Sequence, residues 1–255
     1  MKIALCLSGL IGNAEKWLNG AELDYKYGHK YLKESILEGY DVDVFIHSYS
    51  TKHEDGLKKI YNPVKSVFEQ NPQFKLRGDI DKKDLPTPYA YCLKSMWYSR
   101  KRSVELVAEY EAEKNFKYDF VLLTRFDIAL FKKFKYEEYD KTKLYIAGPI
   151  LANRLPSGHI IPDKINDMYF MSDSNTLLKV VNVSDEYENI AIAMNSKWPM
   201  ESVSSHRVIT EHFLNLNLFE KTECLFERPW QSSRAWSGDI RFLRSDPDVK
   251  LLLDK

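Results

Sequence analysis

A short polar segment, Thr124-Arg125-Phe126-Asp127, follows the most apolar run of the chain. A carboxylate at the rigid end of a buried strand is a good ligand for Mg²⁺ or Mn²⁺, which complete their coordination with phosphate oxygens and water. Asp127 is therefore a candidate metal ligand, and Arg125 is a candidate partner for the charge on a departing diphosphate. The alternative is a surface Arg–Asp pair that closes a turn, and these residues alone do not decide between the two.

Two further segments carry groups that could bind a nucleotide. Ser8 and Gly9 end a short apolar run and indicate a turn whose backbone a nucleotide can approach, although the segment is neither GxGxxG nor a P-loop. Tyr98 and Lys101 are about one turn apart on a predicted helix, so one helix face could meet a base or a phosphate. The plainer interpretations are an ordinary strand-to-helix turn and a solvated helix face.

Candidate bases lie in the second half of the chain. Asp167 precedes an apolar run, where it could hold sugar hydroxyls, act as a base or cap a turn. Glu201 opens an amphipathic run, where it could deprotonate an acceptor hydroxyl or simply interact with the helix dipole. His206, farther along, could face the same pocket or the solvent.

The charge balance argues against a protein that binds nucleic acid. Lys plus Arg and Asp plus Glu number 37 each, whereas proteins that grip phosphate backbones usually carry a basic excess. The three cysteines (Cys6, Cys92 and Cys224) form no CxxC pair and are expected to be reduced thiols, and His47 and His53 match no metal-site spacing. No run approaches the roughly 18 apolar residues that span a bilayer. We therefore expect a cytoplasmic protein without a transmembrane segment or a nucleic-acid partner.

Apolar runs typical of strands alternate with amphipathic runs typical of helices. The predicted strands cover residues 3–7, 42–48, 63–68, 118–124, 144–147, 168–171 and 224–226, and the predicted helices cover 91–115, 176–181 and 201–215, with a further helix that ends at Gly39. A surface loop is expected at 79–88 and irregular structure beyond Arg228. This alternation predicts an α/β fold with a mainly parallel central sheet and helices on both faces.

Ligands of such sheets bind beyond the carboxyl ends of the strands. Three predicted strands end in polar residues, namely Ser8-Gly9, His47-Ser48 and Thr124 to Asp127. If the strands are parallel, all three clusters lie at one edge of the sheet. We therefore expect the chemistry of the protein at that edge.

The order of these motifs resembles that of GT-A-type glycosyltransferases, especially small bacterial and large-DNA-virus sugar transferases. The resemblance covers roughly residues 1–216 and rests on the segments 3–9, 43–48, 95–99, 118–127, 166–167 and 199–201. It implies one GT-A-like domain over residues 1–255, with a nucleotide-binding part at about 1–130 and an acceptor-side part at about 131–255.

The resemblance also implies an activity, namely transfer of a sugar from a nucleoside-diphosphate sugar to a hydroxyl of a glycan or lipid-linked acceptor. The family holds its metal with an Asp-any-Asp motif; because Arg125 takes the first position here, only Asp127 carries over as a ligand for Mn²⁺ or Mg²⁺. Arg125 would then meet the diphosphate together with the turn at Ser8-Gly9. Glu201 is the leading base for an inverting displacement, and Asp167 is the second.

Two other classes of protein stay open. A nucleotidyltransferase that makes an activated sugar would normally show a Gly-rich opening loop with Lys or Arg, which residues 8–13 lack. A noncatalytic glycan-binding or scaffold protein on a decayed transferase fold is the other, because the first aspartate of the family motif is missing.

Overall fold

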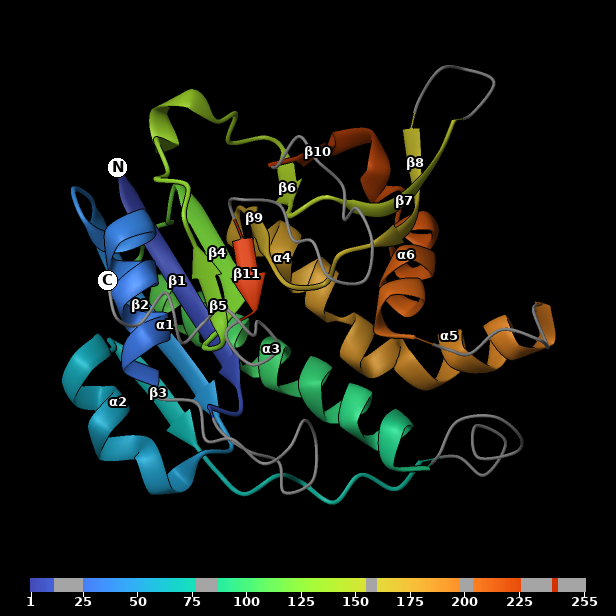
Figure 1. The fold of residues 1–255 in the computed structure, drawn as a ribbon, viewed down its shortest axis with the longest axis horizontal. Helices are drawn as coiled ribbons and strands as arrows, with labels where there is room; N and C mark the ends of the chain where they lie inside the picture. The colour runs from blue at the N-terminus through green and yellow to red at the C-terminus, as the bar shows by residue number, and fades with distance from the viewer. Residues whose placement is uncertain (12–24, 77–86, 155–159, 198–203, 226–239, 243–255) are drawn as a thin grey trace.

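A computed structural model describes residues 1–11, 25–76, 87–154, 160–197, 204–225 and 240–242, and within these ranges the architecture is α/β (Figure 1). Its centre is a seven-stranded sheet. The strands of this sheet are β1 (Lys2–Gly9), β2 (Asp41–Ser48), β3 (Lys65–Phe68), β4 (Phe120–Arg125), β6 (Leu144–Ile146), β9 (Phe170–Ser172) and β10 (Thr222–Cys224).

The strand order is β10-β6-β9-β4-β1-β2-β3, and every strand except β9 runs in the same direction. The chain first builds outward from β1 through β2 to β3 and then crosses to β4 on the other side of β1. The order therefore reverses between β1 and β4, and a reversal of this kind is where open α/β sheets form their ligand crevice.

The sheet is buried on both faces because its strands alternate between two cores. Ala4 and Cys6 of β1 belong to one hydrophobic cluster, while Ile3, Leu5 and Leu7 belong to the other. All five are fully buried, as expected for a strand without a polar face. Such apolar runs are typical of parallel strands that are covered on both sides.

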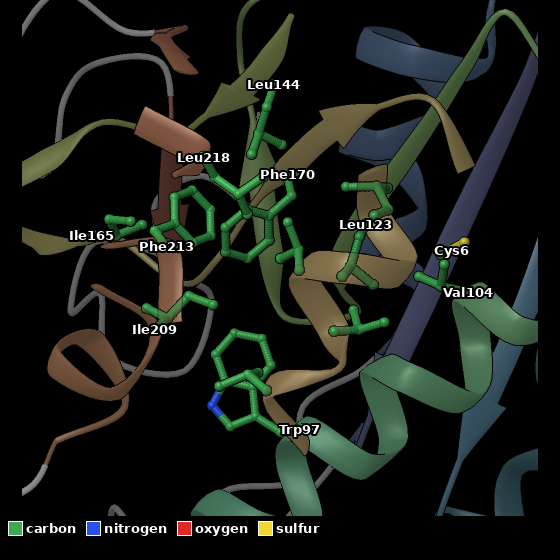
Figure 2. Close-up of a cluster of buried hydrophobic side chains, with 14 of the residues drawn as sticks. Cys6, Trp97, Val104, Leu123, Leu144, Ile165, Phe170, Ile209, Phe213 and Leu218 are labelled. Atoms are coloured by element: carbon green, nitrogen blue, oxygen red, sulfur yellow. The ribbon is translucent and has the colours of Figure 1, made fainter. Parts of the chain in front are cut away.

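Helices cover the two faces unequally. On one face lie α1 (Tyr25–Leu32), its continuation as a π-helix (η2, Lys33–Leu37), and α2 (Glu54–Tyr61). On the other face lie α3 (Thr87–Lys114), α4 (Ser174–Val181), α5 (Val183–Lys197) and α6 (Ser205–Asn215). Figure 2 shows the hydrophobic core between the sheet and these four helices, in which Trp97 of α3 and Phe213 of α6 lie with the sheet residues Leu123 and Phe170.

Smaller elements complete the described chain. β5 (Ile128–Leu130) pairs with β11 (Ile240–Phe242), and β7 (Pro149–Arg154) pairs with β8 (Ile160–Ile165), both antiparallel. Short 3₁₀ turns are η3 (Thr51–His53), η4 (Tyr136–Glu138) and η5 (Leu218–Lys221).

The predicted α/β fold with a mainly parallel sheet and helices on both faces is confirmed, with differences at its margins. The sequence prediction missed α2, α5 and the β7–β8 hairpin, and it did not foresee β11 beyond Arg228. α3 begins at Thr87, inside the loop predicted at 79–88, because a proline is tolerated in the first turn of a helix. The rest of that loop, like Glu201, lies outside the described residues.

Candidate active site

Three strand ends bring polar side chains together beside α3. The strand registers place Ser8 next to both His47 of β2 and Arg125 of β4. Two residues earlier on the same strands are Cys6, Phe45 and Leu123, which belong to the core on the α3 side. Because side chains two apart point to the same face of a sheet, Ser8, His47 and Arg125 also face α3. The predicted meeting of the three polar clusters at one edge is confirmed.

Arg125 and Asp127 form a bidentate ion pair. Arg125 Nε donates to Asp127 Oδ1 at 2.8 Å, and Nη2 donates to Oδ2 at 2.7 Å. The side chain of Asp127 is 1% exposed and that of Arg125 is 25% exposed. Burial opposes the charge on Arg125, but the carboxylates of Asp127 and Asp167 outweigh it and raise the pKa of Arg125. The predicted alternative of an Arg–Asp pair at a turn is therefore present, but the pair is largely buried and not a surface pair.

A second ion pair, between Arg100 and Asp167, is more deeply buried. Arg100 projects from α3, is 1% exposed and stacks over the ring of Trp97, with its guanidinium carbon 4.4 Å from the ring centroid. Its Nη1 donates to Asp167 Oδ2 at 3.3 Å, whereas its buried Nη2 finds no hydrogen-bond partner among the described residues. Arg100 therefore has one buried hydrogen-bond donor that is unsatisfied by the described residues.

Asp167 lies in the turn after β8 and is held by three residues. Besides Arg100, Ser205 Oγ donates to Oδ2 at 2.6 Å and His206 Nδ1 lies 3.3 Å from Oδ1. Burial alone would raise the pKa of Asp167, but His206, Arg100, the Ser205 hydrogen bond and Arg125 together hold it well below its usual range. Asp167 is therefore a carboxylate that stays ionised.

The two ion pairs form one unit, which we call the charge cluster (Arg100, Arg125, Asp127 and Asp167). Burial lowers the pKa of Arg100 and the nearby Arg125 adds to this effect, while Asp167 and Asp127 act in the opposite direction. The formal charges of the four side chains cancel. Buried charges of this kind are expensive unless paired, so their concentration at a strand-order reversal indicates a functional site.

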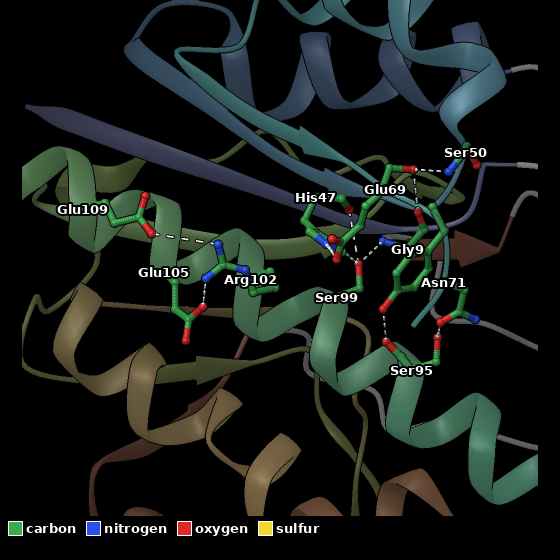
Figure 3. Close-up of polar contacts among 12 residues, drawn as sticks. Gly9, His47, Ser50, Glu69, Asn71, Ser95, Ser99, Arg102, Glu105 and Glu109 are labelled. Carbon is green, nitrogen blue, oxygen red and sulfur yellow. Dashed lines mark hydrogen bonds and ion pairs between the residues drawn. The ribbon is translucent and has the colours of Figure 1, made fainter. Parts of the chain in front are cut away.

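The turn after β1 is held open beside this cluster. Gly9 has φ +97°, and its N–H donates to Ser99 Oγ at 2.8 Å (Figure 3). Its carbonyl accepts from Ser48 Oγ at 2.7 Å. No atom of the described residues would lie within 4 Å of a Cβ at Gly9. A glycine at such a turn permits close approach of a ligand to the backbone.

His47 contacts the same turn indirectly, through Ser99. Its Nδ1 lies 2.8 Å from Ser99 Oγ and its Nε2 lies 3.0 Å from Glu69 Oε1 (Figure 3). Burial is the largest influence and lowers the pKa of His47, although Glu69 acts against it. A neutral His47 that donates to Glu69 and accepts from Ser99 satisfies both contacts, so its role is to position Ser99 and through it Gly9.

Tyr98 and Lys101, the two nucleotide contacts predicted on α3, do not contact the same group. Tyr98 packs edge-on against His47, with 5.8 Å between ring centroids, and against Phe74 at 5.4 Å. Lys101 instead pairs with Asp185 of α5 at 2.5 Å. Tyr98 therefore stays near the site, whereas Lys101 is engaged by another helix.

The described residues do not, as they stand, fit a bound metal ion. Both oxygens of Asp127 accept from Arg125, and Asp167 is already held by three residues. Within the described ranges, no three His, Cys, Asp or Glu side chains are grouped so that they could hold an ion. Asp127 could meet Mn²⁺ or Mg²⁺ only if the guanidinium of Arg125 moved away from it.

No protein-family model matches the chain, and no curated protein matches it either. In the part of the chain that the structure describes, no helix combines the length and the apolar character needed to cross a membrane.

Proposed function

We propose that this protein is a glycosyltransferase, which moves a sugar from a nucleoside-diphosphate sugar to a hydroxyl of a glycan or lipid-linked acceptor. The single observation that carries the proposal is the buried charge cluster beside the open backbone of Gly9, at the carboxyl ends of β1 and β4. An open α/β sheet with its strand-order reversal at this point is compatible with the GT-A-like scaffold that the sequence resemblance implies.

The diphosphate would be met by the two arginines. Guanidinium groups bind phosphate oxygens through paired, charge-assisted hydrogen bonds and keep their charge when partly buried. Arg125 is partly exposed, and Arg100 has a buried donor that finds no acceptor among the described side chains. Asp127 holds the fork of Arg125 in one orientation, so the guanidinium is positioned before the ligand arrives. Fixed donors of this kind stabilise the charge that develops on a leaving diphosphate.

Mn²⁺ or Mg²⁺ at Asp127 stays a prediction, since the carboxylate is bound by Arg125 and the described residues contain no group of three His, Cys, Asp or Glu side chains that could hold an ion. Such an ion would supply additional neutralisation of the diphosphate. Glu201 also stays a prediction as the base, because it lies outside the described residues.

A noncatalytic glycan-binding protein is the second candidate. It is favoured by one observation, the full engagement of Asp127 by Arg125. A protein of this class would bind a sugar chain but would not consume a nucleotide sugar.

The test is release of nucleotide from UDP-, GDP- and dTDP-sugars by wild-type protein, with Mn²⁺ and with a chelator. We expect one donor class to be consumed, and Asp127→Asn to lower kcat/KM about 10- to 100-fold, because the oriented, charge-assisted contact of Arg125 is lost. The matched control is Asp119→Asn, since Asp119 pairs with Lys141 next to the opposite end of β4. Consumption of no donor in either condition would contradict the proposal and favour the noncatalytic candidate.

A further inference from the structure

The buried carboxylate of Asp167 has one partner that reaches the solvent. His206 lies in the first turn of α6, where its side chain is 31% exposed, whereas the side chain of Asp167 is 7% exposed. His206 connects to the charge cluster through Asp167, which in turn pairs with Arg100. A titratable ring therefore lies at the exposed side of the cluster.

The contacts of His206 determine which of its nitrogens carries a proton. Nδ1 lies 3.1 Å from the carbonyl oxygen of Ile165 and 3.3 Å from Asp167 Oδ1. Both neighbours are hydrogen-bond acceptors, so Nδ1 must be the protonated nitrogen. In the neutral ring the lone pair then resides on Nε2.

We infer that His206 is the general base that activates the acceptor hydroxyl, and that Asp167 positions it. This inference rests on the proposed function and names the base for that reaction. A base that is oriented through its second ring nitrogen by a carbonyl or a carboxylate recurs in enzymes of many folds.

Asp167 itself is poorly suited to accept the proton. It is held by Arg100, Ser205 and His206, and its pKa is well below the usual range, so it is a weak base. The same low pKa keeps Asp167 ionised beside His206. A fixed negative charge there stabilises the imidazolium that forms when His206 takes a proton.

The step is a single displacement. His206 Nε2 takes the proton of the acceptor hydroxyl while the hydroxyl oxygen forms a bond to the anomeric carbon of the donor. The bond between that carbon and the diphosphate oxygen breaks, and its electron pair leaves with the nucleoside diphosphate. The proton on His206 is later released to water. One displacement inverts the anomeric configuration.

The charges around His206 are compatible with this cycle. Asp167 faces it directly from the turn after β8, Arg100 of α3 lies on the far side of Asp167, and Arg125 of β4 is close enough to act on the same carboxylate. The positive charge that His206 gains is balanced by the negative charge of Asp167.

The experiment compares His206→Gln, Glu201→Gln and the control His29→Gln by donor hydrolysis over a range of pH. His29 is a partly buried histidine of α1, packed on Tyr61 on the other face of the sheet. We expect His206→Gln to lower kcat about 100- to 10,000-fold with little change in the KM of the donor, and to abolish the rise of the rate with pH. His29→Gln should leave both unchanged.

A second readout does not depend on activity. Nitrogen-15 NMR of the histidine rings in the full chain reports which nitrogen of His206 is protonated near neutral pH, and we expect Nδ1. A proton on Nε2 would overturn the inference, as would an active wild type in which His206→Gln turns over normally or in which Glu201→Gln alone is inactive. A wild type that consumes no donor removes the proposed function, and the role of His206 as its base falls with it.

Discussion

Arg100 is the residue on which the electrostatics of the site depend most. A buried donor without an acceptor costs about 1–3 kcal/mol, and Nη2 of Arg100 is such a donor among the described residues. Trp97, whose ring lies under Arg100, has a second buried N–H without a partner among the described residues. A phosphate oxygen would satisfy a donor of this kind, and buried unsatisfied groups in folded proteins often mark such a function.

We predict that Arg100→Lys weakens binding of the nucleotide-sugar donor about tenfold or more. Lysine keeps a positive charge opposite Asp167 but lacks the second donor of the guanidinium fork. The unfolding free energy should change little, whereas Arg100→Met should cost about 3–5 kcal/mol because it removes the buried cation that pairs with the carboxylate of Asp167. Calorimetric titration and urea unfolding measure the two quantities. The matched control is Arg102→Lys, two residues away on α3, where Arg102 pairs with Glu105 at the surface. Equal donor affinity in Arg100→Lys and wild type would refute the assignment.

The sequence contains most of the cluster, but not the contacts within it. Asp127 and Arg125 could be found because they follow the most apolar strand, which a parallel sheet must bury. Arg100 was missed, although it lies three residues after Trp97 and four before Val104 on the buried stripe of α3. An arginine on an apolar stripe is the signal that could have revealed it. The sequence could not decide between a metal ligand and an ion pair of Asp127 with Arg125, since both require the same residue types.

The turn after β1 illustrates what a strand end contributes to the site. Its backbone is fixed by Ser99 of α3 and Ser48 of β2, and behind Ser99 stands His47. Two hydrogen bonds thus fix a glycine whose φ is positive, and a third contact holds Ser99 in place. The turn is held in place because several side chains bond to it, and its backbone can be approached closely because glycine lacks a side chain.

We predict that Gly9→Ala and Gly39→Ala have similar effects on stability but different effects on binding. Gly9 has φ +97° and Gly39 has φ +91°, and neither Cβ would meet a described atom within 4 Å. Each alanine should therefore cost about 1–2 kcal/mol through backbone strain alone. Only Gly9→Ala should also weaken donor binding, because Gly9 follows Ser8, which pairs with Arg125 at the carboxyl end of β1, whereas Gly39 precedes β2. Urea unfolding and donor titration of both variants check this; equal donor affinities would contradict the placement of the ligand at Gly9.

The sequence predicted where the strands lie along the chain better than it predicted their orientation in the sheet. β1, β2 and β4 were recognisable as apolar runs with polar ends, and their parallel pairing brought those ends together as expected. The antiparallel direction of β9 could not be predicted, because a local pattern does not encode strand orientation. α5 was missed because its sequence mixes polar and apolar residues with weak periodicity, and packing on α3 and α6 stabilises it.

The molecule as a whole should lose stability in acid in two stages. His47 is buried and its pKa is lowered from 6.5, so the unfolded chain binds a proton more readily than the folded one. The stability contributed by neutral His47 is therefore full above that value and declines as the pH falls below it. The pKa of Asp167 is lowered from 3.8, so its contribution is full above that value and declines only in stronger acid.

We predict that urea unfolding over a pH series shows both declines, and that His47→Gln flattens the first one while leaving the second. His212 provides the control, because it is also buried with a lowered pKa but lies in α6, bonded to the carbonyl of Lys179. His212→Gln should remove only its own part of the first decline. A wild type whose stability is constant from neutral pH to mildly acidic pH would show that His47 is not held neutral.

Thermal unfolding with UDP-, GDP- and dTDP-sugars, each with and without Mn²⁺, tests most directly whether a donor diphosphate meets the guanidinium of Arg125 at the carboxyl ends of β1 and β4. A ligand that binds only the folded state raises the unfolding temperature by mass action. We predict that one donor class raises the unfolding temperature of the wild type and that Arg125→Lys loses most of the rise. No rise with any donor, or an equal rise in Arg125→Lys, would contradict the account.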